Sequence, residues 1–99
     1  MQIVVSKYSV ITPIKHLICR DMGEEVAIFN PKTEIPYVLS GVGLNTWKLI
    51  QKTKTVNEIL YALLEEYEVE LPRCEHDLFA FLQELANEEL IEVSNETVG

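Results

Sequence analysis

Cysteine and histidine are scarce in this chain of 99 residues, which has two of each. Cys19 and Cys74 lie far apart and form no CxxC pair, and together with His16 and His76 they match no zinc-ligand spacing. Two unpaired thiols suit a reducing cytosol better than a disulfide-stabilised secreted domain. The sequence therefore predicts neither a disulfide framework nor a metal site, and no cofactor is expected.

Long hydrophobic runs are also absent. The apolar start of the chain is interrupted by Lys7, Pro13 and Lys15, so it forms no continuous signal-peptide core. No stretch of about 18 apolar residues follows that could span a membrane. We expect a cytoplasmic location without membrane association.

Positive charge is rare in the second half of the chain. Residues 55–99 contain one basic residue, Arg73, and twelve acidic residues, whereas residues 1–54 contain seven basic and four acidic residues. The net charge of the whole chain is -8. Because nucleic-acid affinity rests largely on neutralising phosphates, nucleic acid is not an expected partner. The acidic half either keeps the surface soluble or attracts a partly basic ligand.

Catalytic side chains do not form a recognisable set. An enzyme holds a nucleophile, a base or a metal in mutual reach. Cys74 and His76 are two residues apart on an expected helix and point to different faces. Gly41 and Gly43 lack the lysine of a phosphate-binding loop. An acyl carrier protein would need a serine after an aspartate, and no serine here follows one. We therefore expect a protein that is not an enzyme.

The remaining composition, 47% hydrophobic, is that of a single globular domain. Short apolar stretches separated by turn residues predict three strands, at residues 16–19, 26–30 and 35–39. Pro36 lacks the N–H group that a central strand needs. The third strand is therefore expected at the edge of its sheet.

Helical periodicity begins after the third strand. Ser40 can cap a first helix, and Thr55 with Glu58 forms the capping-box pattern that opens a second. Pro72 is favoured in the first turn of a third helix, which we expect to end near residue 86 or 87. Apolar residues recur at helical spacing in all three segments: Leu44, Trp47 and Ile50; Val56, Ile59, Leu60, Leu63, Leu64 and Tyr67; and Leu78, Phe81, Leu82 and Leu85.

This order of elements predicts an α+β fold class, with a three-stranded antiparallel sheet followed by three helices in a winged-helix-like arrangement. The domain is expected to occupy residues 15–93, and its residues 90–93 return to the core as a half-turn or short strand. Residues 1–14 are expected to form an N-terminal arm or a first short strand, and residues 94–99 a frayed tail. A DNA-reading third helix would need basic or amide side chains, and this one is mainly acidic. A winged-helix-like adaptor that binds other proteins stays open as an alternative.

Spaced motifs follow one another in a fixed order from Val26 to Ile91. They are an aromatic strand that ends at Leu39-Ser40, Gly43 followed by Trp47, Leu49 and Ile50, Thr55-Val-Asn-Glu-Ile59, the segment Leu64 to Val69, and Asp77-Leu78, Phe81-Leu82 and Leu85 with Leu90-Ile91. Over roughly two-thirds of the chain they resemble the PqqD-like family, also called RiPP precursor peptide recognition elements. The family usually has Asn where Ser40 stands and Gly where Glu89 stands. The difference at Glu89 concerns the position at which the third helix ends.

The resemblance implies three strands on three helices and a function without catalysis. The leader segment of a ribosomally made precursor peptide would add as a strand to the third strand, in the groove between that strand and the third helix. A stand-alone member with an N-terminal extension is similar to the recognition protein of lasso-peptide pathways, which works with a separate leader peptidase. Stand-alone members that serve radical enzymes are similar in size. The implied partners are a precursor peptide and a leader peptidase or another modifying enzyme.

The residues themselves also indicate the edge of the third strand as the binding site. The segment 35–39 is unusually apolar for an exposed strand, and the unpaired backbone of an edge strand can bind an added strand. On the third helix, a stripe beside the core stripe either forms the groove wall, with Phe79 and Leu82 at the floor of its pockets, or widens the core face. Glu75 and Asp77 are expected to attract a Lys or Arg of the leader. The expected peptide-binding residues are Glu34, Ile35, Pro36, Tyr37, Val38, Leu39, Glu75, Leu78, Phe79, Leu82 and Ala86.

Overall fold

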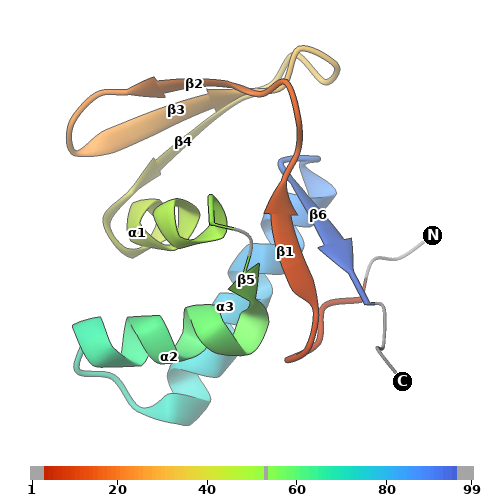
Figure 1. The fold of residues 1–99 in the computed structure, drawn as a ribbon. Helices are drawn as coiled ribbons and strands as arrows, with labels where there is room; N and C mark the ends of the chain where they lie inside the picture. The colour runs from red at the N-terminus through yellow and green to blue at the C-terminus, as the bar shows by residue number, and fades with distance from the viewer. Residues whose placement is uncertain (1–3, 53, 96–99) are drawn as a thin grey trace.

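The computed structural model describes residues 4–52 and 54–95 (Figure 1). The described residues form six strands and three helices, which confirms the α+β class. No helix among them is long and apolar enough to cross a bilayer. The elements are β1 (Val10–Pro13), β2 (Ile18–Asp21), β3 (Glu25–Phe29), β4 (Pro36–Ser40), α1 (Gly41–Ile50), β5 (Lys54–Thr55), α2 (Val56–Glu66), α3 (Leu71–Asn87) and β6 (Ile91–Ser94).

The predicted antiparallel sheet consists of β2, β3 and β4 in that order, and it lies above α1 in Figure 1. Its register pairs Val26 with Leu39 and Ala27 with Val38. Side chains alternate between the two faces of a strand. Val26, Ile28 and Leu39 therefore point into the core, where each is at most 6% exposed. The position of β4 at the sheet edge confirms the expectation drawn from Pro36.

A second sheet, which the sequence did not predict, joins distant parts of the chain. In it β1 lies between β5 and β6, so that Val10 pairs with Thr55 on one side and with Ser94 on the other. Ile11 of β1 is 0% exposed. Of the two alternatives for residues 1–14, the described part therefore contains a short strand. Residues 94–99 are the segment expected as a frayed tail. Within it, Ser94 is the last residue of β6, and residues 96–99 lie outside the described residues.

The first two helices begin as their sequences predict, with one exception. Thr55 Oγ1 accepts a hydrogen bond from the Glu58 N–H at 3.2 Å, and Glu58 Oε1 accepts one from the Thr55 N–H at 2.9 Å, which confirms the capping box. Ser40 occupies the cap position of α1, but its side chain makes no capping hydrogen bond. The sharp entry to α1 is made by Gly41, whose φ of 58° costs glycine little because it has no Cβ.

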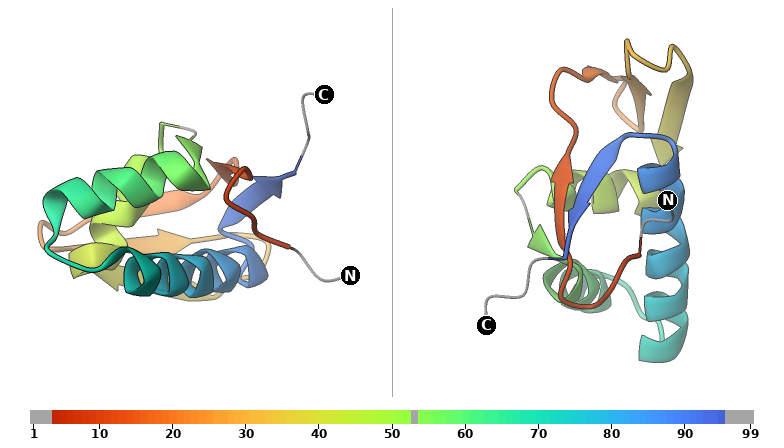
Figure 2. Two further views of the ribbon diagram at one scale, coloured as in Figure 1. Left: turned by 90° about the horizontal axis from the view of Figure 1, so that it is seen from below. Right: turned by 90° about the vertical axis from the view of Figure 1, so that its right-hand side faces the viewer.

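The C-terminal end of α3 is fastened to the turn before β4. Glu89 has a φ of 57°, and the N–H groups of Glu89 and Leu90 donate to the carbonyls of Ala86 (3.1 Å) and Leu85 (2.9 Å). This is the Schellman pattern, in which the left-handed residue is usually glycine. The side-chain amide of Asn30, which is 4% exposed, donates to the Glu89 carbonyl at 2.7 Å. The turn is thereby held on the end of the helix, and β4 is held near α3 (Figure 2).

Candidate functional site

The free edge of β4 is the first feature of the candidate site. In the described part of the chain, β3 pairs with one side of β4 and no strand pairs with the other. An edge strand presents unpaired N–H and C=O groups that can bind another strand. Pro36 has no N–H to offer, and proline is tolerated where that position faces away from the sheet. Val38, two residues further on, has the same orientation along the strand and so directs its own N–H to the free side.

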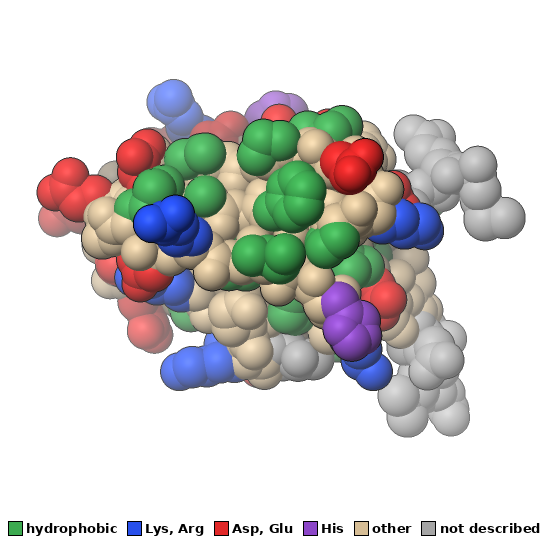
Figure 3. Space-filling view, turned by 90° about the horizontal axis from the view of Figure 1, so that it is seen from above, with side chains coloured by type: hydrophobic (Ala, Val, Ile, Leu, Met, Phe, Trp, Pro, Cys, Tyr) green, Lys and Arg blue, Asp and Glu red, His purple; other side chains and the backbone are tan. Residues whose placement is uncertain are grey.

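The two faces of β4 differ in their surroundings. Tyr37 and Leu39 point toward the helices, and Leu39 is 5% exposed. Val38 points outward and is 54% exposed, and Ile35, just before the strand, is 55% exposed. Phe29 of β3 pairs with Ile18 on one side and Pro36 on the other, so these three share the outer face. The outer face seen from above is accordingly rich in hydrophobic side chains (Figure 3).

The wall of α3 nearest β4 is formed by Phe81 and Glu84. A Cβ atom placed on Gly43 would lie 3.5 Å from Phe81 Cζ and 3.7 Å from Leu39 Cδ2, so the Phe81 ring lies close to the end of β4. The Glu84 side chain lies near the Tyr37 hydroxyl. Burial, interaction with the Glu84 carboxylate and the charge of Glu88 raise the pKa of Tyr37 to about 12.

The residues that the sequence predicted on α3 lie elsewhere on the helix. Leu78, Leu82 and Ala86 are at most 3% exposed and belong to the core. Glu75 Oε2 lies 4.0 Å from Lys7 Nζ and so faces the N-terminal segment. Phe79 is half-buried against the core. In this structure the predicted stripe is therefore not the one that faces β4.

Helix geometry explains why the predicted stripe is not the one that faces β4. Phe79 and Phe81 flank the core stripe at 200° from each other around α3, because each residue turns the helix by about 100°. Hydrophobic periodicity identifies the core face but does not indicate on which side of it β4 will lie. The one signal for Phe81 in the sequence was Gly43, whose missing side chain makes room for a close neighbour.

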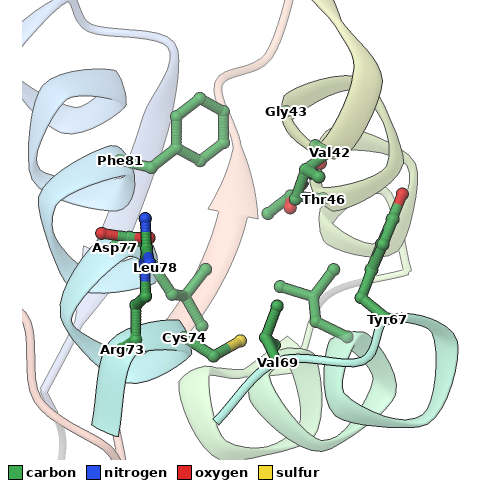
Figure 4. Close-up of a pocket in the computed structure, with 11 residues that line it drawn as sticks. Val42, Gly43, Thr46, Tyr67, Val69, Arg73, Cys74, Asp77, Leu78 and Phe81 are labelled. Atoms are coloured by element: carbon green, nitrogen blue, oxygen red, sulfur yellow. Dashed lines mark hydrogen bonds and ion pairs between the residues drawn. The ribbon is translucent and has the colours of Figure 1, made fainter. Parts of the chain in front are cut away.

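A cavity of about 340 Å³ lies where α1, α3 and the link between α2 and α3 meet (Figure 4). This cavity could not be predicted from the sequence, because its walls come from several separate elements. Val42 and Gly43 line it from α1, Val69 from the link, and Cys74, Leu78 and Phe81 from α3. Burial, followed by the charge of Asp77, raises the pKa of the Cys74 thiol. Leu78, a predicted site residue, is thus one of the residues that line this cavity.

Chemistry beyond binding has little support in the described residues. No three His, Cys, Asp or Glu side chains among them gather where they could hold a metal ion. Cys19 is exposed on β2, and Cys74 is half-buried in α3. The candidate site consists of the free edge of β4 and the cavity that adjoins α1 and α3.

The comparisons with known proteins agree with this geometry. No curated protein matches the chain. A solved structure described as "TbiB1 in Complex with the TbiA(beta) Leader Peptide" is 33% identical, with a TM-score of 0.78 over 82% of this chain and 94% of that one. Residues 25–91 match the family described as Coenzyme PQQ synthesis protein D (PqqD). This match extends over more than half of the sequence and includes β4 and α3, and the chain therefore belongs to the PqqD family.

Proposed function

We propose that the chain binds the leader segment of a ribosomally synthesised precursor peptide and delivers it to a leader peptidase or another modifying enzyme. The observation that carries this proposal is the free edge of β4, which Asn30 holds close to α3 through the Glu89 carbonyl. The similarity of the chain to TbiB1, which was solved with a leader peptide, supports a leader peptide as the ligand. The protein itself performs no catalysis and works in the cytoplasm, in a lasso-peptide or related pathway.

In this proposal the leader pairs with β4 as a fourth strand of the β2–β3–β4 sheet. Backbone hydrogen bonds supply affinity, and alternate side chains of the leader enter pockets that supply specificity. The binding residues are those predicted before and on β4, from Glu34 to Leu39. On α3 we now place Phe81 and Glu84 in the groove wall in place of Phe79 and Leu82, because they lie beside Leu39 and Tyr37.

Replacing Val38 with Pro tests strand addition. The substitution removes an N–H that faces the free edge, so we expect leader binding to be lost while the fold is kept. Val38→Ala is the matched control, because it removes the same side chain but keeps the N–H, and it should bind nearly normally. A folded Val38→Pro variant with unchanged affinity in calorimetry would contradict strand addition.

Backbone amide NMR titration with a synthetic leader peptide locates the site. The first probe is the leader of the precursor encoded by the neighbouring gene, and the second is the TbiA(beta) leader. Shifts at residues 36–40 and along residues 77–88 are expected. If neither peptide causes shifts at high concentration, leader recognition is overturned for both.

A winged-helix-like adaptor is the second candidate function. The observation in its favour is the apolar outer face of the sheet, where Ile18 and Val38 are more than half exposed. Such patches often mark contacts with other proteins. Only leader recognition predicts that a short extended peptide is sufficient for binding, so the same titration separates the two.

A further inference from the structure

The turn between β3 and β4 contains a single buried side chain. Asn30 is 4% exposed, whereas residues 31–36 are exposed or half-buried. The Asn30 side chain uses both of its polar atoms, because Nδ2 donates to the Glu89 carbonyl at 2.7 Å and Oδ1 accepts from the Lys32 N–H at 2.9 Å. The Asn30 carbonyl accepts from the Glu34 N–H at 2.8 Å. One residue therefore both shapes the turn and joins it to the end of α3.

The helix end that receives this hydrogen bond is itself fixed. The Leu90 carbonyl accepts from the Ile14 N–H at 3.1 Å, and Ile91 begins β6, which pairs with β1. Leu90 and Ile91 are at most 3% exposed. The Glu89 carbonyl thus belongs to a part of the chain that is anchored in the core. The bond from Asn30 therefore restrains the turn rather than the helix.

β4 is supported at both of its ends. At its C-terminal end, Leu39 is 5% exposed and lies near Phe81 of α3. At its N-terminal end, Pro36 pairs with Phe29, the residue that precedes Asn30. Without the bond from Asn30, only exposed and half-buried residues of the turn would hold that end of β4 beside α3.

The contact between Asn30 and Glu89 serves geometry more than stability. A buried hydrogen bond between neutral groups contributes little net stability, but a satisfied buried polar group makes the local structure rigid and unique. Glu89 adopts a φ of 57° at this contact, and residues with strained backbones cluster at ligand-binding clamps. The contact therefore has the properties of a device that fixes the position of β4.

We infer that Asn30 is a positioning residue for leader recognition, which keeps the free edge of β4 at the distance from α3 that an added strand requires. This inference rests on the proposed function. An added strand meets the β4 backbone on one side and α3 side chains on the other, so it binds best when both are already in place. Affinity falls in proportion to the fraction of protein in the binding-competent state, and the Asn30 bond keeps that fraction high.

Asn30→Ala and Asn30→Asp test the bond by calorimetry with the synthetic leader. Both remove the Nδ2 donor and should raise the Kd of the leader about tenfold at neutral pH, as expected if the competent fraction falls to about one-tenth. Ser9→Ala is the matched control, because Ser9 is also fully buried and its hydroxyl also joins distant segments, through Asn95. Ser9→Ala should lower the free energy of unfolding and leave the Kd unchanged. Each Kd is measured where circular dichroism shows the variant to be folded.

A pH series separates the lost hydrogen bond from a general change in the fold. A neutral carboxyl group has an O–H that can donate to the Glu89 carbonyl, and burial raises the pKa of such a group. We therefore expect the ratio of the Kd of Asn30→Asp to that of the unchanged protein to fall toward one in acid, with no such recovery in Asn30→Ala. The ratio is used because both proteins share the charged groups of the turn and of the end of α3, which are Lys32, Glu34, Glu88 and Glu89.

Hydrogen exchange tests the same bond in the unchanged protein. Coupling between two equilibria is reciprocal, so a bond that raises leader affinity about tenfold is itself strengthened about tenfold by the bound leader. Saturation with the leader should therefore slow exchange of the Asn30 Nδ2 protons about tenfold in NMR spectra. The Asn95 Nδ2 protons are the control, because they donate to the Val4 carbonyl at 2.8 Å in the N-terminal segment, and their exchange should not change.

The outcomes separate the positioning role from leader recognition. If folded Asn30→Ala binds the leader with an unchanged Kd while Val38→Pro does not bind, the positioning role is overturned and strand addition stands. A Kd ratio for Asn30→Asp that is independent of pH, or Nδ2 exchange that the leader does not slow, also overturns the positioning role. If the unchanged protein does not bind the leader, the proposed function itself is overturned.

Discussion

At the scale of single residues, Glu89 stands in a backbone conformation that favours glycine. Its φ of 57° places it in the left-handed region at the end of α3, where a side chain costs about 1–2 kcal/mol. We expect Glu89→Gly to raise the free energy of unfolding by about 1 kcal/mol, because the lost ion pair with Lys32 is exposed and weak.

Urea denaturation checks this expectation, and Glu88→Gly is the control. Glu88 has a φ of -85°, so glycine brings no relief there and should lower stability. Equal effects of the two substitutions would contradict the assignment of backbone strain to Glu89.

The ionisation of Tyr37 makes the stability of the fold depend on pH. The pKa of Tyr37 is raised from 10 to about 12 by burial and by interaction with the Glu84 and Glu88 carboxylates. The unfolded chain therefore loses this proton at a lower pH than the folded protein does. Stability from this group is intact below pH 10 and is lost as pH rises from 10 to about 12.

Spectrophotometric titration of phenolate absorbance measures this ionisation. Tyr37→Phe should remove a step at about pH 12, Glu84→Gln should lower that step, and Tyr61→Phe should leave it in place. A step that survives Tyr37→Phe would assign it to another tyrosine.

At the scale of elements, the sequence signals that involve only neighbouring residues predicted the structure correctly. The capping box at Thr55 and the proline in the first turn of α3 each concern groups within one helical turn, and both helices start where predicted. The edge position of β4 followed from one missing N–H at Pro36. Which side of α3 faces β4 could not be predicted in the same way, because the choice between Phe79 and Phe81 depends on the packing of α3 against a distant strand.

The start of α2 depends on that capping box. Thr55→Ala removes the oxygen that accepts from the Glu58 N–H, so we expect a loss of about 1 kcal/mol in the free energy of unfolding. Thr55→Ser keeps an oxygen and should retain most of the stability. Hydrogen bonds from the Thr55 N–H and hydroxyl lower the pKa of Glu58, so its contribution is present above the usual carboxyl pKa and declines as pH falls through the lowered value.

Comparing urea denaturation of the two variants at neutral and acidic pH checks both parts. The difference between Thr55→Ala and the unchanged protein should shrink in acid. A difference that does not depend on pH would mean that the carboxylate of Glu58 has no share in the cap.

At the scale of the whole molecule, the second sheet is the feature that sequence patterns missed. β5 has two residues and β1 has four, and both pair with partners far along the chain. Such short pairings leave almost no periodic signal. β1 also lies before residue 25, where the family match begins, yet its Ile11 is completely buried in the common core.

The N-terminal segment should therefore be needed for folding. Ile11→Ala is expected to lower the free energy of unfolding by about 2–5 kcal/mol, as for other buried isoleucines. Ile18→Ala is the control, since Ile18 is 58% exposed and should change stability by at most about 0.5 kcal/mol. Chemical denaturation of both variants measures the difference. Similar small effects would show that β1 is dispensable to the core.

The β2–β3–β4 sheet has a free edge at each end, within the residues described. A sheet open at both ends can join copies head to tail, β2 of one against β4 of the next, and such a contact has no closing symmetry. Charged Arg20 and Asp21 on β2 and Pro36 on β4 oppose this polymerisation. A bound leader would also block it, by occupying β4 and terminating any growing ribbon. Under the proposed function, self-association through β4 and leader binding would therefore exclude each other.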